Sequence, residues 1–118
     1  MLLDEEAKRA GGAAQREDDA VYRCAACGHA LARTGDRLEA ATHTFVNPEA
    51  IEFVLARFRA APGCAAFGAP SAYWSWFPGH VWQVALCGGC GRHVGWSFVA
   101  PESHFHGLIV DRIVGPTP

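Results

Sequence analysis

The sequence predicts a mainly β fold of antiparallel strands, and three observations support this class. Apolar and other residues alternate on both sides of Cys87, with the two-residue period of a half-buried strand. Two Cys-x-x-Cys pairs stand far apart in the chain, and each is followed by glycine. Thirteen glycines and seven prolines favour turns over long helices. A length of 118 residues fits one domain with a modest core.

The first half of the chain contains a lead-in, two candidate strands and a loop. Residues 1–20 are rich in alanine, glycine and charge, so we predict a flexible lead-in and a fold that begins near Val21. Residues 38–46 form a Thr-, Val- and Phe-containing run that ends at a turn pair and predicts a strand. Residues 51–59 are ambiguous between a short helix and a strand, and we favour strand or irregular structure. The composition of residues 61–71 predicts a loop.

The second half is read mainly as strands. Residues 82–86 alternate in character and run into the second cysteine pair. A further strand leaves that pair, with Val94, Trp96 and Phe98 expected on one face. Residues 108–114 predict the final strand, and residues 115–118 a tail.

The two cysteine pairs predict a structural zinc site. Each Cys-x-x-Cys turn presents two sulfurs on one side, and two such turns give the tetrahedral four-sulfur set that structural zinc prefers. A thioredoxin-like redox pair would need a βαβ context, which the sequence does not supply. Four protein ligands leave no open position, so we do not expect the zinc to be catalytic. The predicted ligands are Cys24, Cys27, Cys87 and Cys90.

Two further residues could be mistaken for parts of a reactive site. His93 completes a Cys-x-x-Cys-x-x-His string, but with four sulfurs available we interpret it as an ordinary strand residue. Cys64 stands alone in a Pro-Gly loop without a neighbouring base or basic cluster, so we interpret it as an inert thiol.

Charge and hydropathy exclude several classes of function. The formal net charge is −2 and the sequence has no Lys/Arg stripe, which argues against nucleic-acid binding. No apolar stretch approaches the length of a membrane span, and the N-terminus does not read as a signal peptide. We therefore expect a soluble, cytoplasmic protein that does not bind membranes.

The four tryptophans predict a pocket. All lie between positions 74 and 96, and core residues seldom concentrate in a loop as short and Pro/Gly-rich as the one that holds Trp74 and Trp76. Trp82 and Trp96 lie on the strands that enter and leave the second cysteine turn. Trp76, Trp82 and Trp96 could form three walls, and Phe98 the base. Filling of the core is the alternative explanation for any single tryptophan.

The segment from Trp74 to Phe98 closely resembles the thalidomide-binding domain of cereblon, the CULT domain. The matching motifs are Ser-Trp-Phe-Pro-Gly at 75–79, Trp82, the second cysteine pair, and His-Val-Gly-Trp-Ser-Phe at 93–98. Upstream of this segment, the first cysteine pair and Asn47-Pro48 also occur in the order that the family shows. The resemblance covers roughly residues 21–114.

The resemblance implies a β-tent fold, in which two antiparallel sheets are joined at the zinc site. It implies that Trp76, Trp82 and Trp96 cage a glutarimide, thalidomide or a uracil-like ring. The Trp74 carbonyl would accept the imide N–H and the Trp76 amide would donate to a ring carbonyl. Asn47 and Pro48 would border the mouth, and Phe98 would form the inner wall. We hypothesise that one natural ligand is a cyclic imide at the C-terminus of a damaged peptide.

Two departures limit what the resemblance implies. The position before Ser75 is Trp74, where the animal proteins carry histidine. The chain also lacks the regions by which full-length cereblon joins a ubiquitin ligase, so no ligase partner is inferred. It looks like the free-standing, bacterial-type form of the family.

Two rival functions are less consistent with the sequence than a non-enzymatic imide binder. A methionine sulfoxide reductase B has a related zinc-bearing fold but needs a nucleophilic cysteine on a late strand, and these strands contain none. A methyl-ammonium reader would use the same aromatic cage, but such cages usually add a carboxylate, and no Asp or Glu lies between Glu52 and Glu102.

Overall fold

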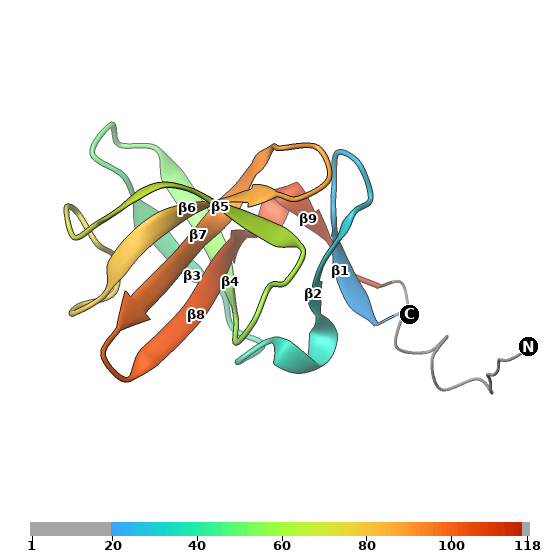
Figure 1. Ribbon diagram of the computed structural model, residues 1–118, viewed down its shortest axis with the longest axis horizontal. Coiled ribbons are helices and arrows are strands. Elements are labelled where there is room, and N and C mark those ends of the chain that lie inside the picture. Colours follow the sequence, from blue (N-terminus) through green and yellow to red (C-terminus); the bar gives the residue numbers. More distant parts are fainter. Residues whose placement is uncertain (1–19, 117–118) are drawn as a thin grey trace, which may run out of the picture.

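The computed structural model describes residues 20–116 as two antiparallel β-sheets (Figure 1). The smaller sheet has the strand order β2-β1-β9, and the larger has the order β3-β4-β8-β7-β6-β5. The strands are β1 (Val21–Cys24), β2 (Ala30–Arg33), β3 (His43–Val46), β4 (Glu52–Phe58), β5 (Cys64–Ser71), β6 (Val81–Cys87), β7 (His93–Ala100), β8 (Ser103–Ile109) and β9 (Ile113–Val114). Two short 3-10 turns, η1 (Thr34–Asp36) and η2 (Val110–Arg112), complete the described elements. The predicted mainly β class with two antiparallel sheets is confirmed.

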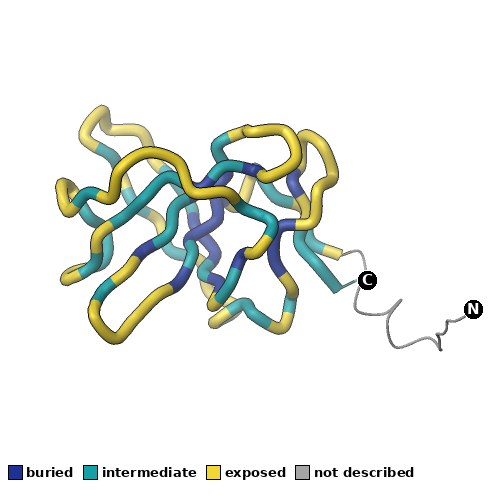
Figure 2. The backbone as a smooth tube through the Cα atoms, in the orientation of Figure 1, coloured by how far each residue is buried: buried dark blue, intermediate teal, exposed yellow. Residues whose placement is uncertain are grey.

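The large sheet buries side chains on both of its faces. Neighbouring residues of β4, Leu55 and Ala56, belong to two different buried clusters, as strand alternation requires. One cluster joins the large sheet to the small one through residues such as Leu31 and Phe58. The other contains Phe98 and a set of aromatic side chains. Figure 2 shows the buried segments gathered where the sheets meet and along the centre of the large sheet.

The prediction of a loop over residues 61–71 is wrong for most of that segment. Cys64–Ser71 forms β5, an edge strand that pairs with β6 from Cys64↔Cys87 to Phe67↔Val84. Its alanines and glycine have low strand propensity, and most of its side chains are exposed. Backbone pairing with β6 therefore decides its conformation, and single-sequence propensity does not record such pairing.

The prediction of one strand over residues 108–114 is also wrong. The strand β8 begins earlier, at Ser103, and ends at Ile109. The turn η2 then redirects the chain, so that β9 pairs with β1 in the other sheet. The apolar run is continuous in sequence because both halves are partly buried, but the halves pack in different sheets.

Two of the remaining strand predictions are shortened or adjusted. The run 38–46 becomes strand only from His43, while 51–59 is confirmed as a strand by β4. Val94 does not share a face with Trp96, because it is the extra residue of a β-bulge between the pairs Ala85↔Gly95 and Leu86↔His93. Val94 packs in the cluster between the sheets, and the His93 ring instead meets Trp96.

The predicted lead-in and tail fall largely outside the structure. Residues 1–19 and 117–118 are not among the described residues. Within the described residues, no helix has the length and apolar character needed to cross a membrane.

Candidate metal centre and ligand pocket

The structure brings the four predicted cysteines together. Their sulfur atoms all lie within 4.8 Å of one another, although the two pairs come from opposite ends of the sequence. The first pair follows β1 in the small sheet, and the second joins β6 to β7 in the large sheet. Figure 1 shows these two turns side by side above the junction of the sheets. The four sulfurs are those of Cys24, Cys27, Cys87 and Cys90.

The two cysteine turns have matching backbone geometry. Gly28 and Gly91 both have φ of +80°, a left-handed conformation that glycine adopts without a steric penalty. Their amides donate to the carbonyls of Cys24 and Cys87, each at 2.8 Å. The glycine after each pair therefore closes the turn and aims both sulfurs in one direction.

The sulfur spacing fits a tetrahedral metal site. With metal–sulfur bonds of about 2.3 Å, the edge of a tetrahedron is about 3.8 Å. The observed separations are 3.8 Å for Cys24 and Cys90, and 3.6 Å for Cys27 and Cys87. A disulfide would need about 2.05 Å, so the set has the spacing of metal ligands. Four cysteines at these distances could hold a metal ion.

Hydrogen bonds favour the ionised form of one ligand. Burial by itself would raise the pKa of Cys87, but backbone amides of the turn, including that of Gly89 at 3.3 Å, lower it to about 6. The neighbouring Cys64 behaves differently, because burial raises the pKa of its thiol to about 11. Cys64 lies opposite Cys87 in the backbone register of β5 and β6, but it does not belong to the four-sulfur group.

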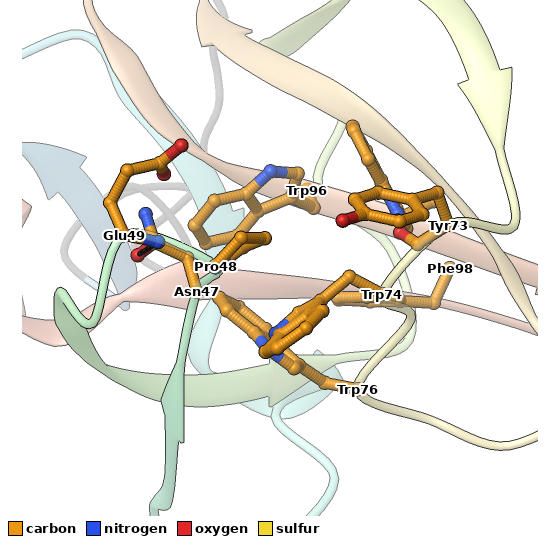
Figure 3. A pocket seen from close by; sticks show the side chains of 9 residues that line it. Asn47, Pro48, Glu49, Tyr73, Trp74, Trp76, Trp96 and Phe98 are labelled. Atoms are coloured by element: carbon orange, nitrogen blue, oxygen red, sulfur yellow. Dashed lines mark hydrogen bonds between the residues drawn. The ribbon is translucent and has the colours of Figure 1, made fainter.

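A cavity of about 300 Å³ opens at the other end of β6 and β7 (Figure 3). Trp82 precedes Cys87 by five residues of strand, which corresponds to about 17 Å. The cysteines therefore position the pocket through the strands and do not touch it. All seven predicted pocket residues line the cavity, together with two others. They are Asn47, Pro48, Glu49, Tyr73, Trp74, Trp76, Trp82, Trp96 and Phe98.

Strand register places three of the aromatic side chains. Trp82 of β6 lies opposite Phe98 of β7, and Trp96 lies two residues along β7. Directly paired residues and residues two apart on a strand share a face. Phe98 is 1% exposed and forms the floor of the cavity, while the indoles stand over it.

The loop between β5 and β6 brings the other two tryptophans. Its main anchor is Phe77, whose ring packs against Phe98 and Phe105 with centroid distances of 4.7 and 4.8 Å. The Trp82 indole N–H donates to the Tyr73 carbonyl at 2.6 Å and ties the loop to β6. The loop is thus fixed to the large sheet at both its start and its centre.

The β3–β4 hairpin closes the opposite side. The Trp74 and Trp76 indole N–H groups both donate to the Val46 carbonyl, at 2.9 and 3.0 Å. Asn47 shapes the hairpin itself, since its side-chain oxygen accepts the amides of Glu49 and Ile51 at 3.0 and 2.9 Å. Asn47 therefore supports the pocket mouth through the turn, as well as lining it.

The indoles of Trp76 and Trp96, two of the three predicted walls, meet at a corner of the pocket. Their centroids are 4.9 Å apart and their planes are 79° apart. A second aromatic layer backs this corner: Phe45 stacks on Trp76 at 5.1 Å, and Phe53 meets both indoles. The cavity remains open between these rings, Trp82 and the rim.

Glu49 and Tyr73 line the pocket but were not predicted from the sequence. Glu49 follows Asn47-Pro48 directly, so its place in the same turn was the available signal. The expectation that the pocket lacks a carboxylate rested on the segment between Glu52 and Glu102, and Glu49 lies just before that segment. Tyr73 adjoins Trp74 and is 68% exposed, so the rim is more aromatic than expected.

Comparison with known proteins identifies the family. The sequence is 32% identical to protein cereblon of Drosophila yakuba over 92 residues, which cover 73% of this chain. It is 33% identical to protein cereblon of Drosophila melanogaster over 90 residues and 71% of the chain. It is 31% identical to that of Drosophila willistoni over 118 residues and 86% of the chain. The chain is a cereblon-like (CULT-type) domain.

The resemblance inferred from the motifs is thereby confirmed. The matched segments are 16%, 15% and 19% of those three relatives, so the cereblon-like domain spans less than a fifth of their length. No family model matches the sequence.

Proposed function

We propose that this cereblon-like domain is a small-molecule-binding module that holds a cyclic imide in its tryptophan pocket. The observation that carries the proposal is the cavity of about 300 Å³ lined by four indoles and Phe98. This volume lies at the small end of the range for ligand pockets. A five- or six-membered imide with apolar CH₂ faces suits such walls.

The pocket loop also offers hydrogen-bonding groups for the edge of an imide. In the described part of the chain, the Trp74 carbonyl and the Trp76 amide have no hydrogen-bond partner. As the family resemblance implies, the carbonyl would accept the imide N–H and the amide would donate to a ring carbonyl. Leaving a buried imide group unpaired would cost about 1–3 kcal/mol, so these two contacts favour imides over plain hydrocarbons.

The proposed metal is zinc, in a structural role. Four thiolates with tetrahedral spacing are the set that structural zinc prefers, and they leave no position for a substrate. Bound zinc would supply a bridge between the small sheet and the β6–β7 turn. The chain's own residues, in the tryptophan pocket, would do the binding.

We propose that the domain is not an enzyme of the methionine sulfoxide reductase type. Such an enzyme needs an activated thiol, and Cys64 is the one cysteine outside the four-sulfur group. The pKa of Cys64 is raised to about 11 by burial, the opposite of activation. A Cys64→Ser variant should bind imides as the unmodified chain does, and thiol-dependent reductase turnover that vanished with this change would revive the enzyme.

A methyl-ammonium reader is the second candidate, because Glu49 supplies the carboxylate that such aromatic cages usually contain. A methyl-ammonium group would be held by cation–π attraction and has no acceptor for the Trp76 backbone amide. An imide carbonyl would accept a hydrogen bond from that amide, so the free amide favours an imide ligand. Competition separates the two: glutarimide should displace a fluorescent imide probe, and trimethyl-lysine should not.

Calorimetric titration with glutarimide tests the proposed function. We expect micromolar binding to the zinc-loaded chain and, with Trp82→Ala, a loss of about 30-fold or more, as for tryptophan anchors at other binding sites. Phe67→Ala is the matched control, since Phe67 is an exposed aromatic residue of β5 outside the pocket. Zinc content and the circular dichroism spectrum should be measured for each variant. Absence of binding by the folded, zinc-loaded chain would refute the proposal.

The natural ligand is proposed to be a cyclic imide at the C-terminus of a damaged peptide. Such a ring is attached through one carbon and needs an open rim, and Tyr73 and Trp74 at the rim are 68% and 52% exposed. Titration should show that an imide-ended peptide binds and the same peptide with an ordinary carboxylate does not. Equal binding of both would contradict this assignment.

A further inference from the structure

The rim of the pocket has an electrostatic character that the aromatic cage does not explain. Of the nine residues that line the cavity in the described structure, Glu49 alone carries a formal charge. Lysine and arginine are absent from this set. A group held at the rim therefore meets one carboxylate without a compensating cation in the lining.

The hairpin fixes the position of Glu49. Its amide donates to the Asn47 side chain at 3.0 Å, and the neighbouring Ala50 amide donates to the Asn47 carbonyl at 2.9 Å. The Asn47 amide in turn donates to the Ile51 carbonyl at 2.9 Å, which closes the loop. The carboxylate thus extends from an ordered turn. Figure 3 shows Glu49 beside Pro48, on the side of the pocket where Trp96 lies.

Glu49 differs in its surroundings from another glutamate of this region. Glu39 is engaged by Arg57 at 2.7 Å and by His43 at 3.1 Å. Among the described residues, Glu49 has neither an ion pair nor a side-chain hydrogen bond. Its carboxylate is therefore available to a group that enters with the ligand.

We propose that Glu49 makes the pocket rim selective for imides whose ring substituent carries a positive charge, such as an amine or a basic side chain of an attached peptide. This inference rests on the proposed function, since it concerns the substituent of the ring that the cage would hold. The Glu49 carboxylate would repel a carboxylate on the substituent. It would therefore also disfavour a ring-opened peptide, which ends in a carboxylate, relative to a peptide that ends in the neutral imide ring.

The expected effect is modest because Glu49 is exposed. Pairs of exposed opposite charges are typically worth a twofold to fivefold change in an equilibrium constant. Raised salt should reduce the effect, because the Debye length falls to about 3 Å at 1 M ionic strength.

The test uses three glutarimides that carry an amide-linked chain on the ring carbon and differ only at its end. The butanoyl chain ends in a methyl group, the β-alanyl chain in an ammonium group and the succinyl chain in a carboxylate. We expect the ammonium ligand to bind the zinc-loaded chain about twofold to fivefold more tightly than the methyl ligand, and the carboxylate ligand more weakly. In Glu49→Gln, the ratio of ammonium to methyl affinity should fall to about one.

Glu102→Gln is the matched control, because it removes the same charge from the turn between β7 and β8, outside the pocket lining. It should retain the wild-type ratio. Equal affinities for the three ligands in the unmodified chain, or a preference that survives Glu49→Gln, would overturn the inference while leaving imide binding intact. Failure of the methyl ligand to bind at all would instead overturn the proposed function, and the inference with it.

Discussion

Among single residues, the pocket tryptophans Trp74 and Trp76 differ in their packing and backbone conformation. Trp76 is packed on Phe45 and Phe53, so it belongs to the core as well as to the cavity. Trp74 is 52% exposed, and its backbone adopts φ of +57°, a left-handed conformation that is rare for a bulky residue. The loop therefore holds Trp74 in a conformation that its own side chain disfavours.

Substitution of Trp74 measures this backbone strain. Trp74→Gly should be more stable to urea than Trp74→Ala by about 1 kcal/mol, because only glycine adopts the left-handed region without a penalty. At most positions glycine is the less stable of the two. Equal stability, or a more stable alanine variant, would show that position 74 is not left-handed in the folded chain.

His106 should make stability depend on pH. Its Nδ1 is buried without a hydrogen-bond partner in the described structure, and burial, aided by the neighbouring His104, lowers its pKa from 6.5 to about 4. Since the unfolded chain binds this proton more readily, the free energy of unfolding should fall as the pH is lowered from 6.5 toward 4. The full effect is no more than about 3 kcal/mol.

Urea unfolding between pH 7.5 and 5 measures the contribution of His106. The decline should be shallower in His106→Gln than in the unmodified chain. His104→Gln should keep most of the slope, because His104 is the smaller cause of the shift. An identical pH dependence in the His106 variant and the unmodified chain would count against the buried neutral imidazole.

At the scale of elements, the connection between β4 and β5 holds the two sheets and the second cysteine turn together. The Gly63 amide donates to the Leu31 carbonyl of β2 at 3.0 Å, and the Gly63 carbonyl accepts the Gly88 amide at 2.9 Å. A Cβ atom at Gly63 would lie 1.8 Å from the Ala30 carbonyl oxygen. This close approach requires glycine.

Gly63→Ala should therefore lower the free energy of unfolding by about 1–3 kcal/mol and weaken zinc retention against a chelator, since the backbone must move apart. Gly35→Ala is the matched control, because a Cβ there meets nothing within 4 Å. Unchanged stability and zinc retention in Gly63→Ala would show that the contact between the sheets is loose.

Sequence patterns predicted some elements and not others for identifiable reasons. The alternation of residue types along β6 and β7 predicted both strands, and the spacing of the cysteines predicted the two turns. The edge strand β5 and the break between β8 and β9 depend on pairing with distant strands. The seven predicted pocket residues converge, whereas the second aromatic layer of Phe45 and Phe53 could not be assigned to a face without knowing the register of β3 and β4.

At the scale of the whole molecule, the four cysteines connect the small sheet to the strands that carry the pocket. The buried cluster between the two sheets itself contains Cys24 and Cys87. If the cysteines hold the proposed zinc, metal binding and folding are expected to be coupled, as in small domains with structural zinc.

Cys87→Ser should abolish stable zinc binding and leave the chain unfolded or aggregated, as judged by metal analysis and thermal unfolding. Cys64→Ser is the matched control and should retain one zinc ion per chain, because Cys64 lies outside the four-sulfur group. A cooperative, undiminished thermal transition in Cys87→Ser would contradict the proposed structural role of the metal.

Imide recognition by the pocket is tested most directly by an NMR titration of the ¹⁵N-labelled, zinc-loaded chain with glutarimide. The backbone amide of Trp76 and the indole signals of Trp82 and Trp96 should shift together and saturate, while the amides of Gly28 and Gly91 in the cysteine turns stay in place. Signals of the pocket that remain unmoved at millimolar glutarimide, or shifts confined to other surfaces, would contradict the assignment of this cavity as an imide site.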